Sequence, residues 1–144
     1  MSKREDILAN IKTAITNNTV AAVVERKLRH WEQIADQEFP YVAVIDGPES
    51  KTVHPGDYYR NQFQVNIHCY VKEPDEDLLS TSANTMLADL INAVQQDPRR
   101  NNNAINTIIT TVDIDEGVLT MSGLPYVWFQ LTAIVEYEHP ALTP

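Results

Sequence analysis

The chain has a single cysteine, only four glycines and no long apolar run, and each scarcity excludes a class of protein. Cys69 leaves no partner for an intramolecular disulfide, and its position in an apolar strand pattern predicts a buried, unreactive thiol. So few glycines could hardly build a phosphate-binding loop, and no CxxC, HExxH or GxSxG motif is present. Because no apolar run approaches about 20 residues, we expect a cytosolic protein without a membrane span or signal peptide.

Basic residues are scarce in the second half of the chain. Residues 73–144 contain only Arg99 and Arg100 against eleven acidic residues, so the net charge of −9 arises there. An acidic half does not bind phosphates, and its plain interpretation is a solvated surface. A sharper hypothesis is a surface that stays close to nucleic acid without holding it.

Catalytic and metal-binding patterns are also missing. The histidines lie on different predicted elements without metal-ligand spacing: His30, His54, His68 and His139. Asp113, Asp115 and Glu116 could in principle hold a hard cation, but three acids after a strand are more often an ordinary turn. We therefore predict no catalytic residue, no metal ion and no cofactor.

What the sequence does contain is one long alternation, at Tyr58–Val71. Its apolar residues all point one way and its polar residues the other, which predicts a strand with one buried face at the centre of a sheet. Fourteen extended residues span on the order of 45 Å. A domain of this length has a radius of gyration of roughly 14 to 15 Å, so we expect the strand to cross the core or extend beyond it, where a partner could reach it.

Two amphipathic helices accompany this strand. Ser2 and Glu5 form a capping box for a first helix that should end near Asn17–Thr19. The acids after Pro74 open a second helix, which should end near Asp97 and be followed by a solvated turn, RRNNN. The two apolar stripes are Ile7, Leu8, Ile11, Ala14 and Ile15 in the first helix, and Leu79, Ala83, Met86, Leu87, Leu90 and Val94 in the second.

Shorter patterns complete the predicted sheet. The valine-rich stretch 19–25 reads as a short strand, although its alanines leave a continued helix open, and residues 26–38 are assigned to a loop in which Trp31 and Ile34 could anchor a helical turn. Further strands are predicted at 41–46, 106–114, 118–121 and 125–137, with a frayed tail at 138–144. The order helix, short strand, hairpin, helix, hairpin indicates one α+β domain, residues 1–144, with a mostly antiparallel sheet and two helices on one face.

Residues 47–57, GPESKTVHPGD, are predicted to form an extended loop at the tip of the first hairpin. They contain two glycines and two prolines, and loops of this length are often functional. The tip is therefore a candidate contact site, and its candidate partner-binding residues are Glu49, Ser50, Lys51, Thr52, His54 and Asp57.

Five segments together resemble one protein family. They are a short first helix (REDILANIKTAI), a strand that begins after proline (FPYVAVIDGPES), a long strand followed by an acidic helix start (FQVNIHCYVKEPDED), an apolar helix (ANTMLADLINAV) and a last strand (WFQLTAIVEYEH). Over nearly the whole chain this combination resembles the tail terminator, or tail completion, proteins of long-tailed bacteriophages.

The resemblance implies a structural virion protein, assembled in the host cytoplasm, without catalytic residues. It implies a homo-oligomeric ring, usually hexameric, that caps the tail tube protein, stops tube growth and meets the head connector or head completion protein. In such a ring Asp113, Asp115 and Glu116 are candidate channel-lining residues, past which DNA moves without specific binding. Another phage neck or minor tail adaptor is an alternative, and so is a small-molecule-binding domain, which would need a pocket enclosing several of His68, Asp113 and Arg60.

Overall fold

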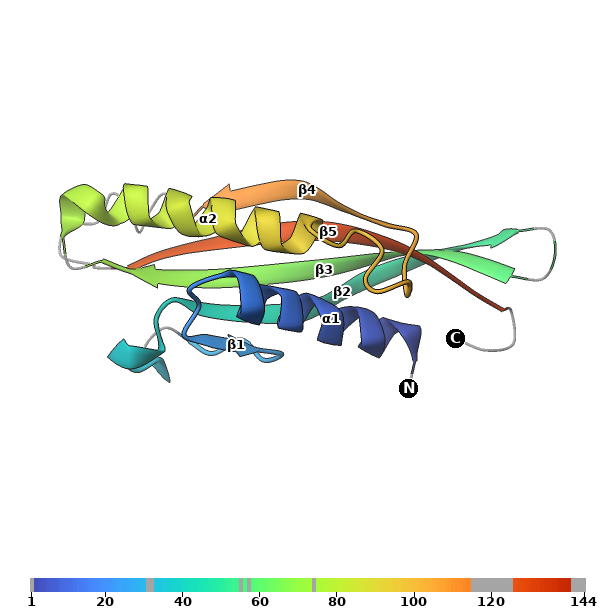
Figure 1. The fold of residues 1–144 in the computed structure, drawn as a ribbon, viewed down its shortest axis with the longest axis horizontal. Helices are drawn as coiled ribbons and strands as arrows, with labels where there is room; N and C mark the ends of the chain where they lie inside the picture. The colour runs from blue at the N-terminus through green and yellow to red at the C-terminus, as the bar shows by residue number, and fades with distance from the viewer. Residues whose placement is uncertain are drawn as a thin grey trace.

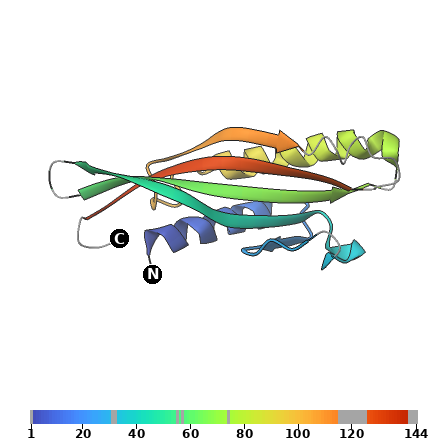
Figure 2. The same ribbon diagram turned by 180° about the vertical axis from the view of Figure 1, so that it is seen from behind.

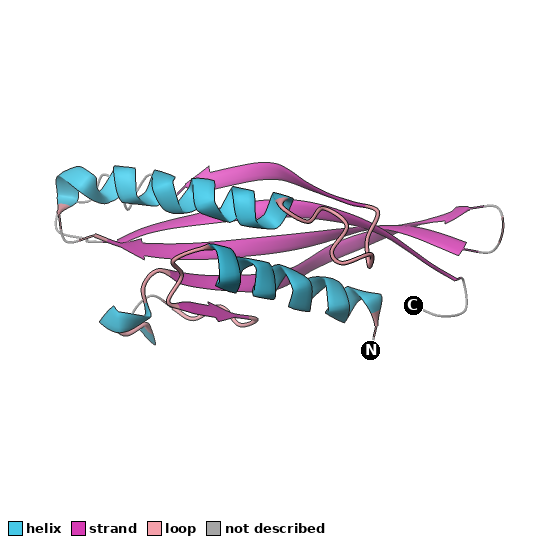
Figure 3. Ribbon diagram, in the orientation of Figure 1, coloured by secondary structure: helices cyan, strands magenta, loops and turns pink. Residues whose placement is uncertain are grey.

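The computed structural model describes residues 2–30, 33–54, 56, 58–73, 75–114 and 126–140. In this part of the chain, two helices lie side by side on one face of a five-stranded sheet (Figure 1). The elements are α1 Lys3–Asn18, β1 Val23–Glu25, β2 Tyr41–His54, β3 Tyr58–Lys72, α2 Leu79–Gln95, β4 Asn106–Ile114 and β5 Tyr126–Pro140, with short 3₁₀ turns at Asp36–Glu38 and Glu76–Leu78 (Figure 3).

The sheet has the strand order β1-β2-β3-β5-β4, so β3 is its central strand. The β1–β2 pair is parallel, whereas the β2–β3, β3–β5 and β4–β5 pairs are antiparallel. The predicted α+β fold, its mostly antiparallel sheet and the placement of both helices on one face are confirmed.

The first helix begins as its sequence predicts. The Ser2 hydroxyl accepts a hydrogen bond from the backbone N–H of Glu5 at 3.2 Å, which satisfies one of the free donors of the first turn. Ile7, Leu8, Ile11 and Ile15 are buried against the sheet.

The second helix packs beside α1 but starts differently from the prediction. The Asp75 carboxylate accepts a hydrogen bond from the N–H of Asp77 at 3.0 Å, so it caps the 3₁₀ turn that precedes α2 and not α2 itself. Leu90 is fully buried, whereas Leu87 is half-buried and packs against the rim of the same core.

The core lies between the helices and the facing side of the sheet. Every second residue of β3 from Phe63 to Val71 points into it, as the alternation predicts, and Val65, Ile67 and Leu131 have no exposed surface. At roughly 1.5 to 3 kcal/mol for each large apolar side chain removed from water, this layer supplies most of the stabilisation of the fold. Figure 2 shows the opposite face of the sheet, which neither helix covers.

The predicted loop at 47–57 is wrong over most of its length. β2 runs on to His54 and pairs with β3 from Glu49↔Phe63 to His54↔Tyr58. Gly47 and Pro48 do not end the strand: the register shifts between Asp46 and Glu49, so they form a β-bulge. A Cβ on Gly47 would lie 2.7 Å from the backbone oxygen of Gln64, which is why glycine occupies this position.

Two other boundaries also need correction. β5 continues through Glu138 to Pro140, where a frayed tail was predicted, because these residues pair with Tyr58, Tyr59 and Arg60 of β3. In the turn after α2, Arg100 is fully buried, where a solvated residue was predicted. Its guanidinium donates a hydrogen bond to the carbonyl oxygen of Val94, one of the last carbonyls of the helix. Trp31 and the predicted strand at 118–121 lie outside the described residues.

Candidate functional site

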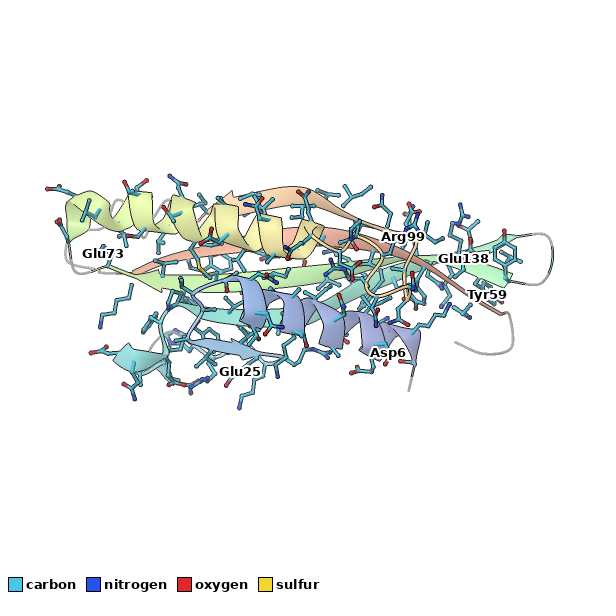
Figure 4. All side chains as sticks on the ribbon, in the orientation of Figure 1. Asp6, Glu25, Tyr59, Glu73, Arg99 and Glu138 are labelled. Carbon is cyan, nitrogen blue, oxygen red and sulfur yellow. The ribbon has the colours of Figure 1, made fainter. Side chains whose placement is uncertain are left out.

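The feature that stands out is a three-stranded extension of the sheet, which we call the arm. It consists of residues 49–54 of β2, 58–62 of β3 and 137–140 of β5, and it extends past the start of α1 (Figure 1). Figure 4 places Tyr59 and Glu138 at this end of the molecule and Glu73 at the opposite end. The expectation that the long strand overruns the core is therefore confirmed.

The base of the arm is held by a buried carboxylate. The Tyr137 hydroxyl donates to Glu49 Oε1 at 2.5 Å, the Lys51 ammonium lies 2.9 Å from Glu49 Oε2, and Arg4 of α1 lies 3.6 Å from Oε1. Burial alone would raise the pKa of the Glu49 carboxyl, but Tyr137, Lys51 and Arg4 outweigh it and hold this pKa below its ordinary value. Burial, together with the hydrogen bond to Glu49, raises the pKa of the Tyr137 hydroxyl.

A second set of polar contacts continues outward on the same face. Lys51 Nζ donates to Asn61 Oδ1 at 3.0 Å and lies 3.2 Å from His139 Nε2. The rings of Tyr59 and His139 lie 5.3 Å apart. Asn61 and His139 are buried, and their contacts with Lys51 join the strands of the arm by side chains as well as by backbone pairing.

The other face of the arm carries an ion pair at its surface. Arg60 Nη2 lies 2.7 Å from Glu138 Oε1, and both side chains are more than a third exposed. The carboxylate raises the pKa of the Arg60 guanidinium. The arm is therefore a polar, ordered projection.

The predicted partner-binding residues occupy different positions on this projection. Ser50, Lys51 and Thr52 are exposed on β2, but the Glu49 side chain is only 9% exposed and is engaged inside the arm. His54 ends β2, and Asp57 lies outside the described residues. Sequence reasoning missed Val53, an apolar residue of the arm that is 66% exposed, because one valine in a polar stretch carries no pattern.

The predicted channel-lining residues are only partly described. Asp113 is exposed near the end of β4, opposite Gln130 of β5, while Asp115 and Glu116 lie outside the described residues. Gln130 also pairs with His68 of β3, so His68 and Asp113 flank it on the helix-free face. Arg60 lies eight residues along β3 from His68, about 26 Å away at 3.3 Å per residue, so the three polar residues named for a binding pocket do not converge.

No metal-binding cluster is found among the described residues. They contain no group of three His, Cys, Asp or Glu side chains able to hold a metal ion. Cys69 is buried, and burial raises the pKa of its thiol, as expected for an unreactive cysteine. The His68 ring stacks on Trp128 at 5.6 Å, and burial lowers its pKa.

The surface hollows formed by described residues also lack converging chemistry. One of them, about 310 Å³, is lined by residues that include Val20, Val71 and Met86. His68, Asp113 and Arg60 line none of these hollows. No helix in the described ranges is long and apolar enough to cross a membrane.

Comparison with known proteins gives the context for the arm. A search of curated proteins found no match. Among solved structures, a chain from the virion of a native gene transfer agent particle has the same fold, with a TM-score of 0.59, 12% identity, and coverage of 92% of this chain and 94% of that one. The family model of the Bacteriophage Tail Tube Terminator Protein matches residues 3–142. Because this match spans nearly the whole sequence, the chain belongs to the bacteriophage tail tube terminator family and is a structural protein of the virion tail.

Proposed function

We propose that this protein assembles as a ring of six copies on the end of the tail tube, stops tube growth and forms the joint to the head connector. The observation that carries the proposal is the arm, an ordered extension of the sheet with exposed Ser50, Thr52 and Val53 at a distance from the helix-covered core. Such a projection supports contact with a neighbouring subunit or with the tube. We assign the protein no enzymatic activity and no cofactor.

The proposed ring encloses a channel through which DNA passes without specific binding. Asp113, with Asp115 and Glu116, is the candidate lining, and in a hexamer each carboxylate recurs six times. Repeated negative charge would keep phosphates in a hydrated, mobile state. The lack of basic residues after Arg100 favours this arrangement.

The role of the arm can be tested by removing its β2–β3 hairpin while the register of the two strands is kept. Since Ser50 pairs with Gln62, replacing residues 51–61 with an Asn-Gly turn joins the two strands at a matched pair. We expect the shortened chain to keep its circular dichroism spectrum, because the apolar core cluster lies outside the deleted residues. We expect it to form no rings in electron micrographs and to leave tails unjoined to heads. Normal tail joining would show that the arm is only a connector.

The channel lining has its own test. Changing Asp113, Asp115 and Glu116 to Lys shifts each subunit by six charge units, and we expect intact rings that bind DNA at low salt and release it as salt rises. A matched control changes the three acids before α2, Asp75, Glu76 and Asp77, to Lys. If the altered ring gains no DNA affinity, these three residues lie outside the channel.

A further inference from the structure

The two edges of the sheet differ in how they are protected from other strands. β1, at one edge, has only three residues, and charged side chains surround it: Arg29 bridges Glu25 and Glu38 at 3.0 and 2.7 Å. Short edge strands and charges are common protections against pairing with another chain. β4, at the other edge, has nine residues, no proline and a single charge, Asp113.

Exposed apolar side chains lie along the β4 edge. Ile105, Ile108 and Val112 are 42%, 48% and 40% exposed, and they lie on or next to β4. A long edge strand with exposed aliphatic side chains is a template for a further strand. Within the part of the chain that the structure describes, no strand lies outside β4.

A second free edge is present on the arm. β1 pairs only with Tyr41, Val42 and Ala43 of β2, and Arg26 then lies against Asp46 at 2.7 Å. Beyond the bulge, the outer edge of β2 from Glu49 to His54 has no partner strand among the described residues. This edge carries Val53, which is 66% exposed.

Strand direction makes these two edges compatible. β2, β3, β5 and β4 lie next to one another with alternating direction, so β4 runs opposite to β2. A second copy placed beside β4 in the same orientation would therefore present its β2 as an antiparallel neighbour. Val53 and Val112 lie on the helix side of the sheet, opposite Tyr59 and Leu131 respectively, so they could cover each other.

We infer that β4 of one subunit pairs with the arm edge of β2, residues 49–54, in the next copy of this chain. The contact joins two different surfaces of the chain. Repeating such a contact produces a closed ring when the rotation between successive subunits is a whole fraction of a full turn. Because β1 already pairs with the first residues of β2, β4 of the neighbouring copy can pair only with the arm end of that strand. Each copy is therefore shifted along the strand direction relative to its neighbour, as strands are staggered in closed barrels. The inference rests on the proposed ring and names the partner of the arm within it.

Disulfide trapping tests this pairing with little background, because the one native cysteine is buried. One protein carries Thr52→Cys on the arm, and the other carries Ile108→Cys, Thr111→Cys or Asp113→Cys; all of these positions face the helix-free side. These three sites are spaced along β4, so one of them should come within the Cα separation of about 4.4 to 6.8 Å that a disulfide requires. Lys12→Cys, exposed on α1, is the control partner.

We expect one β4 variant to form a covalent dimer with Thr52→Cys after oxidation, and the Lys12→Cys control to form none. Rings of normal mass without any such dimer would overturn the strand pairing and leave the proposed ring intact. Dimers formed by a β4 cysteine variant alone would indicate a two-fold contact between β4 strands. Such a contact contradicts the pairing of β4 with the arm and also the proposed ring. A protein that stays monomeric and forms no cross-link would also contradict the pairing and the ring. Cross-linked assemblies that do not close into rings would support the pairing and contradict the ring.

A charge placed on the edge gives an independent measurement. Val112→Lys should raise the protein concentration needed for assembly by about tenfold or more, which corresponds to ~1.4 kcal/mol. The matched control is Val20→Lys, at an apolar residue that is 72% exposed and lies on neither edge, and we expect it to assemble like the native chain. Equal effects of the two substitutions would overturn the role of β4.

Discussion

The arm and the helix-covered part of the sheet are built from the same strands but are held together differently. Under the helices, the inward side chains of β3 and β5 are apolar and buried, as at Val65 and Leu131. In the arm, the same side of the sheet carries Glu49, Lys51 and Asn61, which contact one another or Tyr137. Each hydrogen bond contributes only about 1 kcal/mol net to the free energy of unfolding. The polar contacts of the arm therefore fix its conformation but add little to the stability of the protein, so the arm can be altered without unfolding the core.

The largest loss should come from the helix-covered part. Leu90→Ala removes a fully buried side chain of α2 and should lower the free energy of unfolding by roughly 2 to 5 kcal/mol in urea denaturation. Leu87→Ala, at a half-buried position in the same helix, is the control and should cost clearly less. Equal losses at the two positions would mean that the rim of the core is packed as tightly as its centre.

The junction between the two regions should be the next most sensitive. Gly47→Ala places a methyl group 2.7 Å from the backbone oxygen of Gln64, and we expect a loss of roughly 1 to 3 kcal/mol because backbone cannot move aside cheaply. Ser50→Ala, exposed on the arm side of the bulge, should change stability little. A Gly47→Ala protein as stable as the native chain would show that the bulge relaxes freely.

Within the arm, Glu49→Gln should cost roughly 1 to 2 kcal/mol at neutral pH, since the charge is lost but an acceptor for Tyr137 stays. Folding lowers the pKa of Glu49, so its contribution is complete above the ordinary carboxyl value of about 4.5 and is lost as the pH falls through the lower folded value. The difference between native and variant proteins, measured by thermal unfolding across pH 2 to 7, should therefore shrink on acidification. A constant difference would assign the effect to packing.

The smallest effect should come from the surface of the arm. Arg60→Gln removes the ion pair with Glu138, whose side chains are 42% and 37% exposed, and we expect no measurable change in the midpoint of urea unfolding. Glu138→Gln should behave in the same way. A shift as large as that of Glu49→Gln would mean that the outer face of the arm is also structurally coupled to the core.

Local patterns predicted most of the fold. The cap at Ser2, the stripe that contains Leu90 and the alternation of β3 each depend on residues close in sequence, and each is present. The Gly47–Pro48 bulge could not be predicted because glycine and proline favour bulges as well as loops. What decides between them is the pairing with β3, which a local pattern does not contain.

The candidate site was harder to predict for the same reason. Glu138 was assigned to a tail, but it contacts Arg60, 78 residues away, and Arg100 was assigned to solvent, but the end of α2 buries it. Glu49 lies in a polar, turn-rich stretch that predicts a solvated residue, but Tyr137, 88 residues away, and Arg4 of α1 hold its carboxylate inside the arm. Contacts with residues far away in the sequence therefore decide which residues of the arm are exposed and which hold its strands together.

The position of β5 has a consequence for how the protein is made. β5 follows every other strand along the chain, yet it lies inside the sheet, between β3 and β4. Until it leaves the ribosome, the edges of β3 and β4 that it will occupy have no native partner, and the arm lacks its third strand. A nascent chain therefore cannot present a finished arm, and translation itself delays the moment at which a subunit becomes competent to join others.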